Sequence, residues 1–227
     1  MSGREYSDRV NQSDPTPDDP DGPLMRQAQA GDLAAFEELV GRLQPRVYGL
    51  SLRILGETHD AEDVTQQTFL SLIEHLGDFR GETAVAGWVL RIAANHALKL
   101  LRKRRGHPTV PLAEADEGYA DLPHPQYIAP WRNDAIELAS RHETRELIDR
   151  ALAELDDKYR AVFVLRDVEG FSVKETAELL GLSEANVKVR LLRARLALRE
   201  KLTPTLGDDG ARVRPHAHHL LAQESRP

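Results

Sequence analysis

The stretch GFSVKETAELLGLSEANVKVRLLRAR, residues 170–195, predicts two helices separated by a tight turn. Ser172 followed three residues later by Glu175 is the capping-box pattern, so a short helix is expected to begin directly after the serine. Gly181 can adopt the left-handed conformation that ends this helix, and Ser183 can cap the next one. Two helices joined by a turn of about three residues that contains a glycine predict a helix-turn-helix.

The second of these helices is strongly basic. Residues 183–201 hold six Lys or Arg and two acids, a net charge of plus four, in a chain whose formal net charge is -7. Such a helix can lie in the major groove, where some cations donate to guanine and others neutralise phosphates. The side chains expected to face DNA on this ground are Lys188, Arg190 and Arg193. A solvated basic helix would carry the same charge, but it would not require the capping box and the glycine turn.

A second basic segment lies earlier in the chain. Residues 91–105 hold six Lys or Arg and no acid; with the plus four above this makes plus ten, so the remaining residues sum to minus seventeen. Two concentrated basic segments in an acidic chain indicate two places that meet a polyanion. A pair of solvated helix faces is the alternative that charge alone leaves open.

Composition predicts an all-α protein. The chain has 227 residues, 41% of them hydrophobic, and Ala, Leu, Glu and Arg dominate where strands would need Val, Ile, Thr and aromatic residues. There is no cysteine, which excludes disulfides, cysteine-based zinc sites and thiol nucleophiles and fits a reducing cytoplasm. The sequence shows neither a signal-peptide core nor a run of about 20 apolar residues, so we expect a cytoplasmic protein without membrane insertion.

Proline and acidic residues divide the chain into two small helical domains. Residues 1–22 hold too little apolar surface to fold and are expected to be a disordered tail. Residues 106–133 contain five prolines and four acids, which predicts a flexible acidic linker. The domains are therefore expected at 23–105 and 134–202, followed by a tail at 203–227.

Apolar periodicity predicts helices throughout the first domain. They are expected at residues 33–43, 45–56, 59–76 and 83–105. Asp32 is the expected N-cap of the first helix, and Pro45 suits the first turn of the second. Thr83 is the expected cap of the last, and the spacing of Trp88 places that side chain in the core.

The last of these helices has a polar and basic row. Arg91, Asn95, Lys99 and Arg102 lie three or four residues apart and therefore share one face. An amide among cations can read a base edge while its neighbours hold phosphate. An asparagine in a helix is, however, more often simply exposed.

Three stretches together resemble the bacterial sigma-70 family of transcription initiation factors, in its extracytoplasmic-function (ECF) group. They are DAEDVTQQTFL at 60–70, FRGE with GWVLRIAANHALKLLRKRR at 79–105, and LAELDDKYRAVFVLRDVEGFSVKETAELLGLSEANVKVRLLRARLALRE at 152–200. The resemblance covers residues 23–105 and 144–202. It implies a helical sigma region 2 in the first domain, a region 4 helix-turn-helix in the second, and a factor that binds core RNA polymerase.

The resemblance also implies where polymerase docks. An acidic and amide face resembles the surface that docks on the coiled coil of the beta-prime clamp; it consists of Asp60, Asp63, Gln66 and Gln67. The neighbouring acids Glu62 and Asp63 alone would suggest acid/base or metal chemistry, but nothing nearby supplies a nucleophile or a ligand set. We therefore expect that the protein is not an enzyme and that it binds neither a metal ion nor a cofactor. The second domain is expected to meet the beta flap.

By the same resemblance, a loop and a helix face would capture the melted non-template strand of the minus-ten promoter element. These residues are Phe79, Arg80, Gly81, Glu82, Thr83, Arg91, Asn95, Lys99, Arg102 and Lys103. Holding a base outside the stack costs a few kcal/mol, which a pocket and phosphate contacts must offset.

Region 4 would read the minus-thirty-five element as duplex. The residues assigned to it are Ser183, Lys188, Val189, Arg190, Leu192, Arg193 and Arg195. Val189 and Leu192 are apolar, so contacts with a thymine methyl group are expected among the base contacts.

The resemblance also extends to the linker and to a protein partner. The acidic linker resembles the ECF connector that threads toward the RNA exit path, and an anti-sigma protein is expected as a further partner.

The main alternative function is that of a ligand-sensing regulator that binds an operator as a dimer. His216, His218 and His219 in the C-terminal tail form a cluster that is more often solvated than metal-bound.

Overall fold

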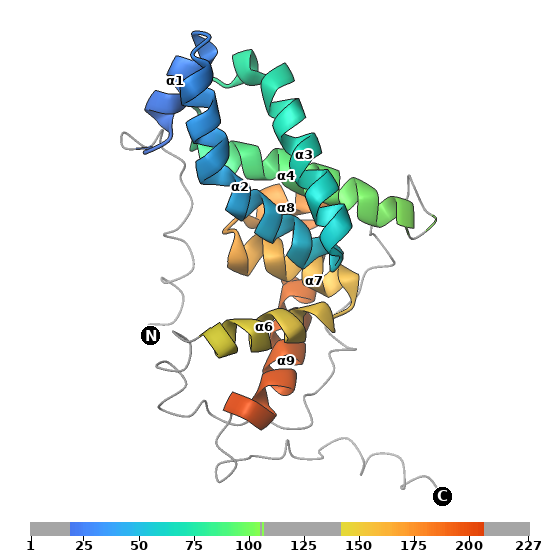
Figure 1. The fold of residues 1–227 in the computed structure, drawn as a ribbon. Coiled ribbons are helices and arrows are strands. Elements are labelled where there is room, and N and C mark those ends of the chain that lie inside the picture. Colours follow the sequence, from blue (N-terminus) through green and yellow to red (C-terminus); the bar gives the residue numbers. More distant parts are fainter. Residues whose placement is uncertain (1–18, 105, 107–141, 207–227) are drawn as a thin grey trace, which may run out of the picture.

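The computed structural model describes residues 19–104, 106 and 142–206. Within these ranges the chain is helical and has no strand, which confirms the all-α class (Figure 1). The predicted linker and most of both predicted tails lie outside the described residues. The predicted tail bounds are wrong at their inner ends, because Gly22 begins a helix and residues 203–206 continue one. The helices are α1 (Gly22–Gln29), α2 (Leu33–Leu55), α3 (Thr58–Glu74), η1 (Leu76–Asp78), α4 (Val85–Arg104), α6 (His142–Ala153), α7 (Asp157–Phe163), η3 (Val164–Val168), α8 (Val173–Leu180) and α9 (Glu184–Leu206).

Helix α2 is continuous through Pro45, so the predicted break at this proline is wrong. Proline removes the hydrogen bond that would reach the carbonyl of Gly41. Pro45 and Gly41 are both exposed, so water can reach that carbonyl. Leu43 and Val47, on either side of the proline, belong to one buried stripe. Packing along this stripe therefore keeps the two halves in one helix.

Helices α2, α3 and α4 form the core of the first domain, and α1 lies against α2 (Figure 1). The inward face of α3 consists of Ala61, Val64, Thr68 and Leu72, all of which are buried. Burying each large aliphatic side chain stabilises the fold by about 1.5–3 kcal/mol. The bundle therefore holds rigidly the outer faces of α3 and α4, on which the predicted binding residues lie.

The first turn of α4 is capped from a distance. The carboxylate of Asp19 accepts a hydrogen bond from the backbone N–H of Val85 at 2.8 Å. Thr83 is exposed and makes no such bond, so its prediction as the cap is wrong. A carboxylate at this position satisfies an N–H that lacks a helical partner and faces the positive end of the helix dipole.

The helix-turn-helix has the local structure that the sequence predicts. The Glu175 N–H donates to Oγ of Ser172 at 3.1 Å, and the Ser172 N–H donates to Oε2 of Glu175 at 2.8 Å, which completes the capping box. Gly181 ends α8 at φ 68°. Oγ of Ser183 accepts from the N–H of Asn186 at 3.2 Å in the first turn of α9.

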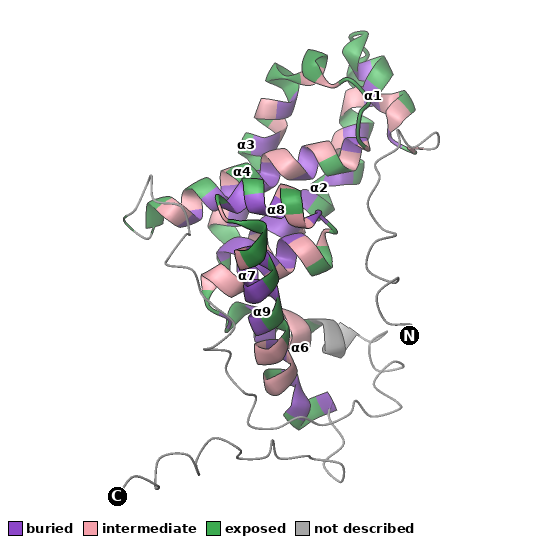
Figure 2. Cartoon of the chain, turned by 180° about the vertical axis from the view of Figure 1, so that it is seen from behind, coloured by how far each residue is buried: buried purple, intermediate pink, exposed green. Residues whose placement is uncertain are grey.

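The helix-turn-helix packs against the bundle in a way that the sequence did not predict. One buried cluster includes Ile54 and Leu90 of the bundle together with Val162, Leu165 and Leu180 of the second domain. Figure 2 shows buried residues continuing from α2 and α4 into α7 and α8. The far half of α9 packs instead on α6. The described domains thus share a core.

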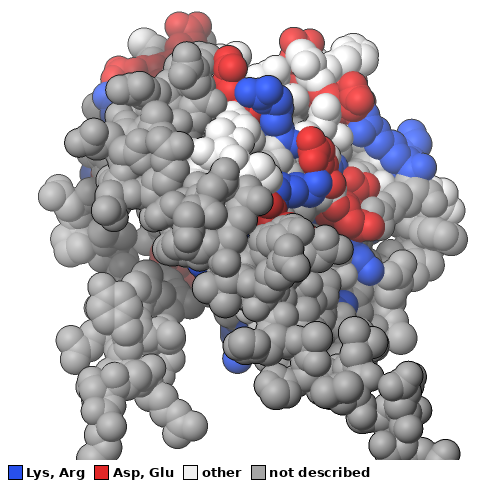
Figure 3. Space-filling model, turned by 90° about the horizontal axis from the view of Figure 1, so that it is seen from below, with Lys and Arg blue, Asp and Glu red and all other residues white. Residues whose placement is uncertain are grey.

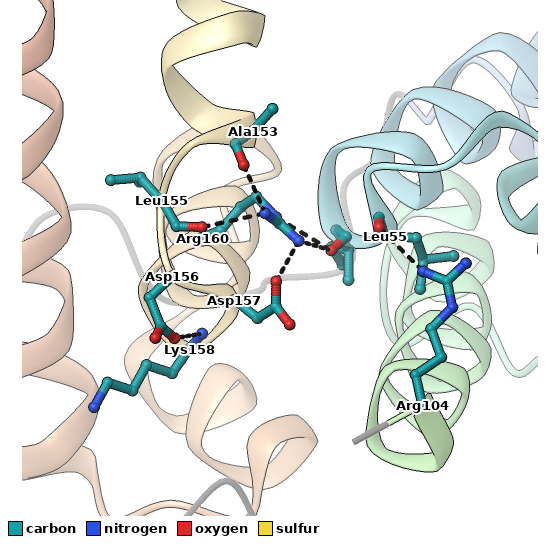
Figure 4. Close-up of polar contacts among 9 residues, drawn as sticks. Leu55, Arg104, Ala153, Leu155, Asp156, Asp157, Lys158 and Arg160 are labelled. Carbon is teal, nitrogen blue, oxygen red and sulfur yellow. Dashed lines mark hydrogen bonds and ion pairs between the residues drawn. The ribbon is translucent and has the colours of Figure 1, made fainter. Parts of the chain in front are cut away.

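Arg160 of α7 fastens this junction (Figure 4). Its Nε and Nη2 donate to the carbonyl of Ile54 at 3.3 and 3.1 Å, at the C-terminal end of α2. Its Nη1 donates to the carbonyls of Ala153 and Leu155 at 3.1 and 3.2 Å, and Asp157 accepts from Nη2 at 2.5 Å. Carbonyls at a helix end lack helical partners, so the buried guanidinium satisfies groups from both domains at once.

Candidate nucleic-acid interface

The outer face of α3 is polar at one end and apolar at the other. Asp63, Gln66 and Gln67 are exposed, as the sequence predicted for a docking face. Leu70 and Ile73, which were not predicted to belong to this face, continue along the helix and are 46% and 56% exposed. Large apolar side chains at this exposure next to polar groups are typical of protein interfaces.

Asp60, the remaining member of the predicted docking face, is less exposed than the other three: it is half-buried and points toward α4. Its carboxylate forms an ion pair with Arg104 at the end of that helix. Arg104 also donates to the carbonyl of Leu55 at 3.3 Å. Asp60 therefore joins three helices of the bundle and is less available to a partner than Asp63.

The loop between η1 and α4 projects from the bundle with its first residue anchored. The Phe79 ring lies against Trp88, with centroids 5.2 Å apart and planes tilted by 49°. Trp88 is half-buried, so its prediction as a core residue is only partly met. Arg80 and Glu82 at the tip are exposed, and Gly81 between them has a φ of 77° that favours glycine. Phe79 and Trp88 line one side of a cavity of ≈ 330 Å³, and residues 169–171 and Glu175 of the second domain line the other side.

In the polar and basic row on α4, some side chains are exposed and one bonds the backbone of its own helix. Asn95, Lys99 and Lys103 are exposed. Nε of Arg102 donates to the carbonyl of Leu98, one turn earlier, at 3.1 Å. The structure therefore presents an amide and two ammonium groups along one side of α4, which is the arrangement predicted for holding a single strand.

A groove connects this row to the α3 face. It is lined by side chains from both helices, namely Asp60, Asp63, Val64, Gln67, His96, Lys99, Leu100 and Lys103. Nε2 of His96 lies 3.0 Å from Oγ of Ser71. Burial, together with the nearby charge of Lys99, lowers the pKa of His96, so the neutral imidazole is favoured there.

On α9 the structure exposes one face of the predicted reading residues. Lys188, Leu192 and Arg195 are exposed, and Ser183 lies at the start of the helix. The guanidinium of Arg195 donates to both carboxylate oxygens of Asp167 at 2.7 Å each. These hydrogen bonds raise the pKa of Arg195 and fix the direction of its side chain.

The other three reading residues face inward. Val189 and Arg193 are 3% and 6% exposed, and Arg190 is fully buried. Nη1 of Arg193 lies 3.4 Å from Oη of Tyr159 in α7. The expectation that these side chains project from the domain is therefore wrong for this arrangement. The physical reason is the 100° step of the helix, which turns them away from the face of Lys188 and toward neighbouring elements.

Ion pairs cross the boundary between the two domains. Arg91 of α4 lies between Glu175 and Glu178 of α8, with Nη2 2.5 Å from Oε2 of Glu178. Arg46 bonds Glu169 at 3.0 Å. In Figure 3 the Lys and Arg of the described residues are interspersed with Asp and Glu on the visible face. A cation assigned to promoter DNA is thus already engaged by acids of the helix-turn-helix.

Several of these contacts carried no signal in the sequence. Asp19 reaches α4 across 66 positions, and Arg160 reaches Ile54 across 106. Such separations leave no local pattern. Leu70 and Ile73, by contrast, do carry a signal in the sequence, because they are apolar residues on the polar side of α3.

Other kinds of site find little support in the described ranges. Among those residues, no three His, Asp or Glu side chains are grouped so that they could hold a metal ion. No helix among them is long and apolar enough to cross a bilayer. The tail histidines lie outside the described part of the chain.

Known proteins match the chain along both domains. The family description Sigma-70 region 2 matches residues 39–107, and Sigma-70, region 4 matches residues 145–198. The chain is 33% identical over 178 residues to the ECF RNA polymerase sigma factor SigM of Mycobacterium tuberculosis (strain ATCC 25618 / H37Rv), covering 78% of this chain and 82% of the relative. It is 31% identical over 181 residues to the ECF RNA polymerase sigma factor SigW of Bacillus subtilis (strain 168), covering 78% and 94%.

A solved structure, that of CnrH in complex with the cytosolic domain of CnrY, is similar with a TM-score of 0.49 and 28% identity, covering 82% of this chain and 99% of that chain. The two family descriptions fall on the bundle and on the helix-turn-helix, in the order that the sequence predicted. Together with relatives that are more than 30% identical along most of their length, they show that the chain belongs to the sigma-70 family, as an ECF sigma factor that acts in transcription initiation.

Proposed function

We propose that the protein binds core RNA polymerase and directs it to promoters through the surfaces described above. The observation that carries the proposal is that two polar faces of different character lie side by side on one bundle. The face on α3 is acidic and amide-rich, the row on α4 is basic, and the same chain carries a helix-turn-helix. One face suits a protein partner and the other a polyanion.

The α3 face is proposed to dock on the beta-prime clamp. Asp63, Gln66 and Gln67 would make the polar contacts. Leu70 and Ile73 would supply the apolar centre, since water-excluding contacts near the middle of an interface carry most of the binding free energy. Asp60, held by Arg104, would act mainly through the shape of the bundle.

The loop at 79–83 and the α4 row are proposed to hold the melted minus-ten strand. After the second domain leaves the bundle, the Phe79 and Trp88 side of the cavity would offer aromatic surface to an unstacked base. Asn95 can bond a base edge, while Lys99 and Lys103 neutralise phosphates along the same side of α4. No catalytic group is needed, because binding the single strand shifts the melting equilibrium.

The helix-turn-helix is proposed to read the minus-thirty-five duplex through α9. Lys188, Leu192 and Arg195 already face outward. Val189, Arg190 and Arg193 are assigned to the same duplex, and their burial means that they would reach it only after a rearrangement.

Promoter geometry requires a second rearrangement, in which the two domains separate. Elements named for positions ten and thirty-five are separated by about 25 base pairs, or about 85 Å of duplex at about 3.4 Å per pair. In the structure Arg91 of the minus-ten surface bonds Glu178 of the helix-turn-helix. The second domain would therefore leave the bundle in the active complex, with the beta flap holding it at its new position. An anti-sigma partner that holds the free factor inactive remains a prediction from the family resemblance.

Assembly with purified core polymerase tests the proposal. The Asp63→Ala, Gln67→Ala double variant should elute apart from core polymerase on size exclusion at concentrations where the wild type co-elutes. The matched control replaces an exposed acid and an exposed amide of α2, in Glu37→Ala, Gln44→Ala, and should co-elute as the wild type does. A wild-type chain that shifted duplex DNA as a dimer and ignored polymerase would support the operator-binding alternative instead.

A further inference from the structure

We propose that Asp19 and Gln29 are positioning residues for minus-ten recognition, because they fix the two ends of the loop at 79–84. Neither residue is assigned a role in promoter recognition above, and both precede the region 2 match that begins at residue 39. The inference rests on the proposed function, since it assumes that this loop receives promoter DNA.

Gln29 holds the beginning of the loop. Its side-chain amide donates to the carbonyl of Leu76 at 2.8 Å and to that of Phe79 at 3.1 Å. These carbonyls lie at the two ends of a single 3-10 turn, η1, which has few hydrogen bonds of its own. The side-chain amide of Gln29 therefore fixes the backbone of the turn and that of Phe79, the first residue of the loop.

Asp19 holds the end of the loop. Its Oδ2 accepts from the N–H of Val85 at 2.8 Å, while its Oδ1 accepts from the N–H of Asp21 at 3.2 Å. The carbonyl of Asp19 accepts from the N–H of Gly22 at 3.0 Å. The carboxylate is thus itself fixed against the start of α1 while it fixes the start of α4.

Between these two points the loop has little support of its own. Residues 80–83 are exposed, and Phe79 rests on Trp88. A cavity of ≈ 300 Å³ separates the loop from α1, and Asp19, Arg26 and Gln29 line its floor. A loop held at both ends above a cavity keeps one shape only as long as both ends are held. Fixing that shape in advance lowers the entropy lost when a base is captured.

The geometry assigns the two residues an indirect role. Their polar atoms bond protein backbone, so they would not touch DNA themselves. Loss of either side chain should lower the discrimination among bases at the minus-ten element. It should change neither the recognition of duplex DNA by α9 nor the docking of α3 on polymerase. An effect confined to the minus-ten element distinguishes a role in positioning the loop from a general loss of stability.

The experiment compares Gln29→Met with Gln27→Met. Methionine has the length of glutamine without its donor, and Gln27 is an exposed residue of the same helix with no side-chain bond to the loop. Holoenzyme made with each full chain is presented with duplexes randomised over both promoter elements, and heparin-resistant open complexes are sequenced. Gln29→Met should lower discrimination among minus-ten bases about 3- to 10-fold, the range expected for one or two lost hydrogen bonds. Preference at minus-thirty-five should not change.

Asp19 supplies a second variant with a rescue. Asp19→Ala should have the same effect as Gln29→Met, while Asp19→Asn, which keeps an acceptor oxygen, should recover most of the discrimination. Unchanged minus-ten preference in both Gln29→Met and Asp19→Ala would overturn the inference. An equal loss at both promoter elements would overturn it as well, because it would indicate general destabilisation.

A readout on the free chain keeps this inference distinct from the proposed function. In a Trp131→Phe background Trp88 is the single tryptophan of the chain. If Gln29 holds Phe79 against Trp88, Gln29→Met should raise the acrylamide quenching of Trp88 by about twofold, and Gln27→Met should leave it unchanged. Increased quenching in a chain that failed to bind polymerase would refute the proposed function and leave the positioning of the loop intact. Unchanged quenching would overturn the positioning itself.

Discussion

Nη2 of Arg91 in α4 lies 2.5 Å from Oε2 of Glu178 in α8. The contact joins a cation of the proposed minus-ten surface to the first helix of the helix-turn-helix. Arg46 with Glu169, and Arg53 with Asp149 at 3.1 Å, cross the same boundary. The packing of the second domain against the bundle, here called the closed arrangement, therefore combines a buried apolar contact with ion pairs. The Arg91 and Arg53 pairs are partly exposed, so salt and a competing polyanion can weaken them, whereas the Glu169 side chain is only 4% exposed.

Reversing one of these charges should loosen the closed arrangement. Glu178→Lys replaces attraction to Arg91 by repulsion, and an exposed pair contributes up to about 1 kcal/mol, so the ratio of closed to open chains should fall up to about fivefold. Because the chain has no cysteine, Glu62→Cys and Glu184→Cys allow specific labelling for energy transfer. Transfer efficiency should fall in the variant.

The matched control for that measurement breaks an ion pair within one domain. Glu154→Lys removes the bond to Lys201, 2.6 Å long, which does not cross the boundary. Its transfer efficiency should equal that of the parent. Equal efficiency in the Glu178→Lys chain would instead show that the Arg91 contact has no part in holding the domains together.

Arg160 should matter more than any surface pair. Arg160→Met leaves the carbonyls of Ile54, Ala153 and Leu155 without their buried donor, and we expect the free energy of unfolding to fall by about 2–4 kcal/mol. Urea denaturation measures the loss. Arg150→Met, at an exposed site of α6, should change it by less than about 0.5 kcal/mol. Similar values for the two variants would contradict the fastening role.

The glycine of the helix-turn-helix should not accept a side chain. Gly181 has a φ of 68°, so Gly181→Ala should destabilise the chain by about 1–2 kcal/mol. Gly41, inside α2, has open space around an added Cβ, and Gly41→Ala should stabilise by about 0.5–1 kcal/mol. Urea midpoints of the two variants should therefore move in opposite directions; a shared direction would refute the backbone argument.

His96 should make stability depend on pH. Its pKa is lowered by burial and by Lys99, so the unfolded chain binds the proton more readily than the folded chain. The contribution is fully present above the ordinary value of about 6.5 and is lost as pH falls through the window below it. The free energy of unfolding of the wild type should decline in this window relative to His96→Gln. His59→Gln, at an exposed site of α3, should retain the decline.

Local features of this fold were predictable because neighbouring residues determine them. The capping box of Ser172 and Glu175 and the left-handed Gly181 each need only a few adjacent positions. Asp32 likewise caps α2 as expected, accepting from the N–H groups of Ala34 and Ala35. The helix break predicted at Pro45 was wrong because the free-energy cost of a proline inside a helix is offset by a buried stripe that extends along the whole of α2.

The relation between the domains was not predictable in this way. Charge indicated that Arg91 and Arg193 belong to two separate basic surfaces, yet one is paired across the domain boundary and the other is buried. Composition counts charges but does not show which way they face. The family resemblance indicates what each surface would bind, while the closed packing depends on contacts between residues far apart in sequence.

Transcription by reconstituted holoenzyme tests the central claim most directly. Core polymerase, the full chain and a library of genomic fragments are combined, and transcript ends are sequenced. We expect new transcripts that begin at discrete sites, require the added chain, and decline in the Asn95→Ala, Lys188→Ala variant, which lacks one contact proposed for each promoter element. Core polymerase that gave the same transcripts with and without the chain would contradict the account.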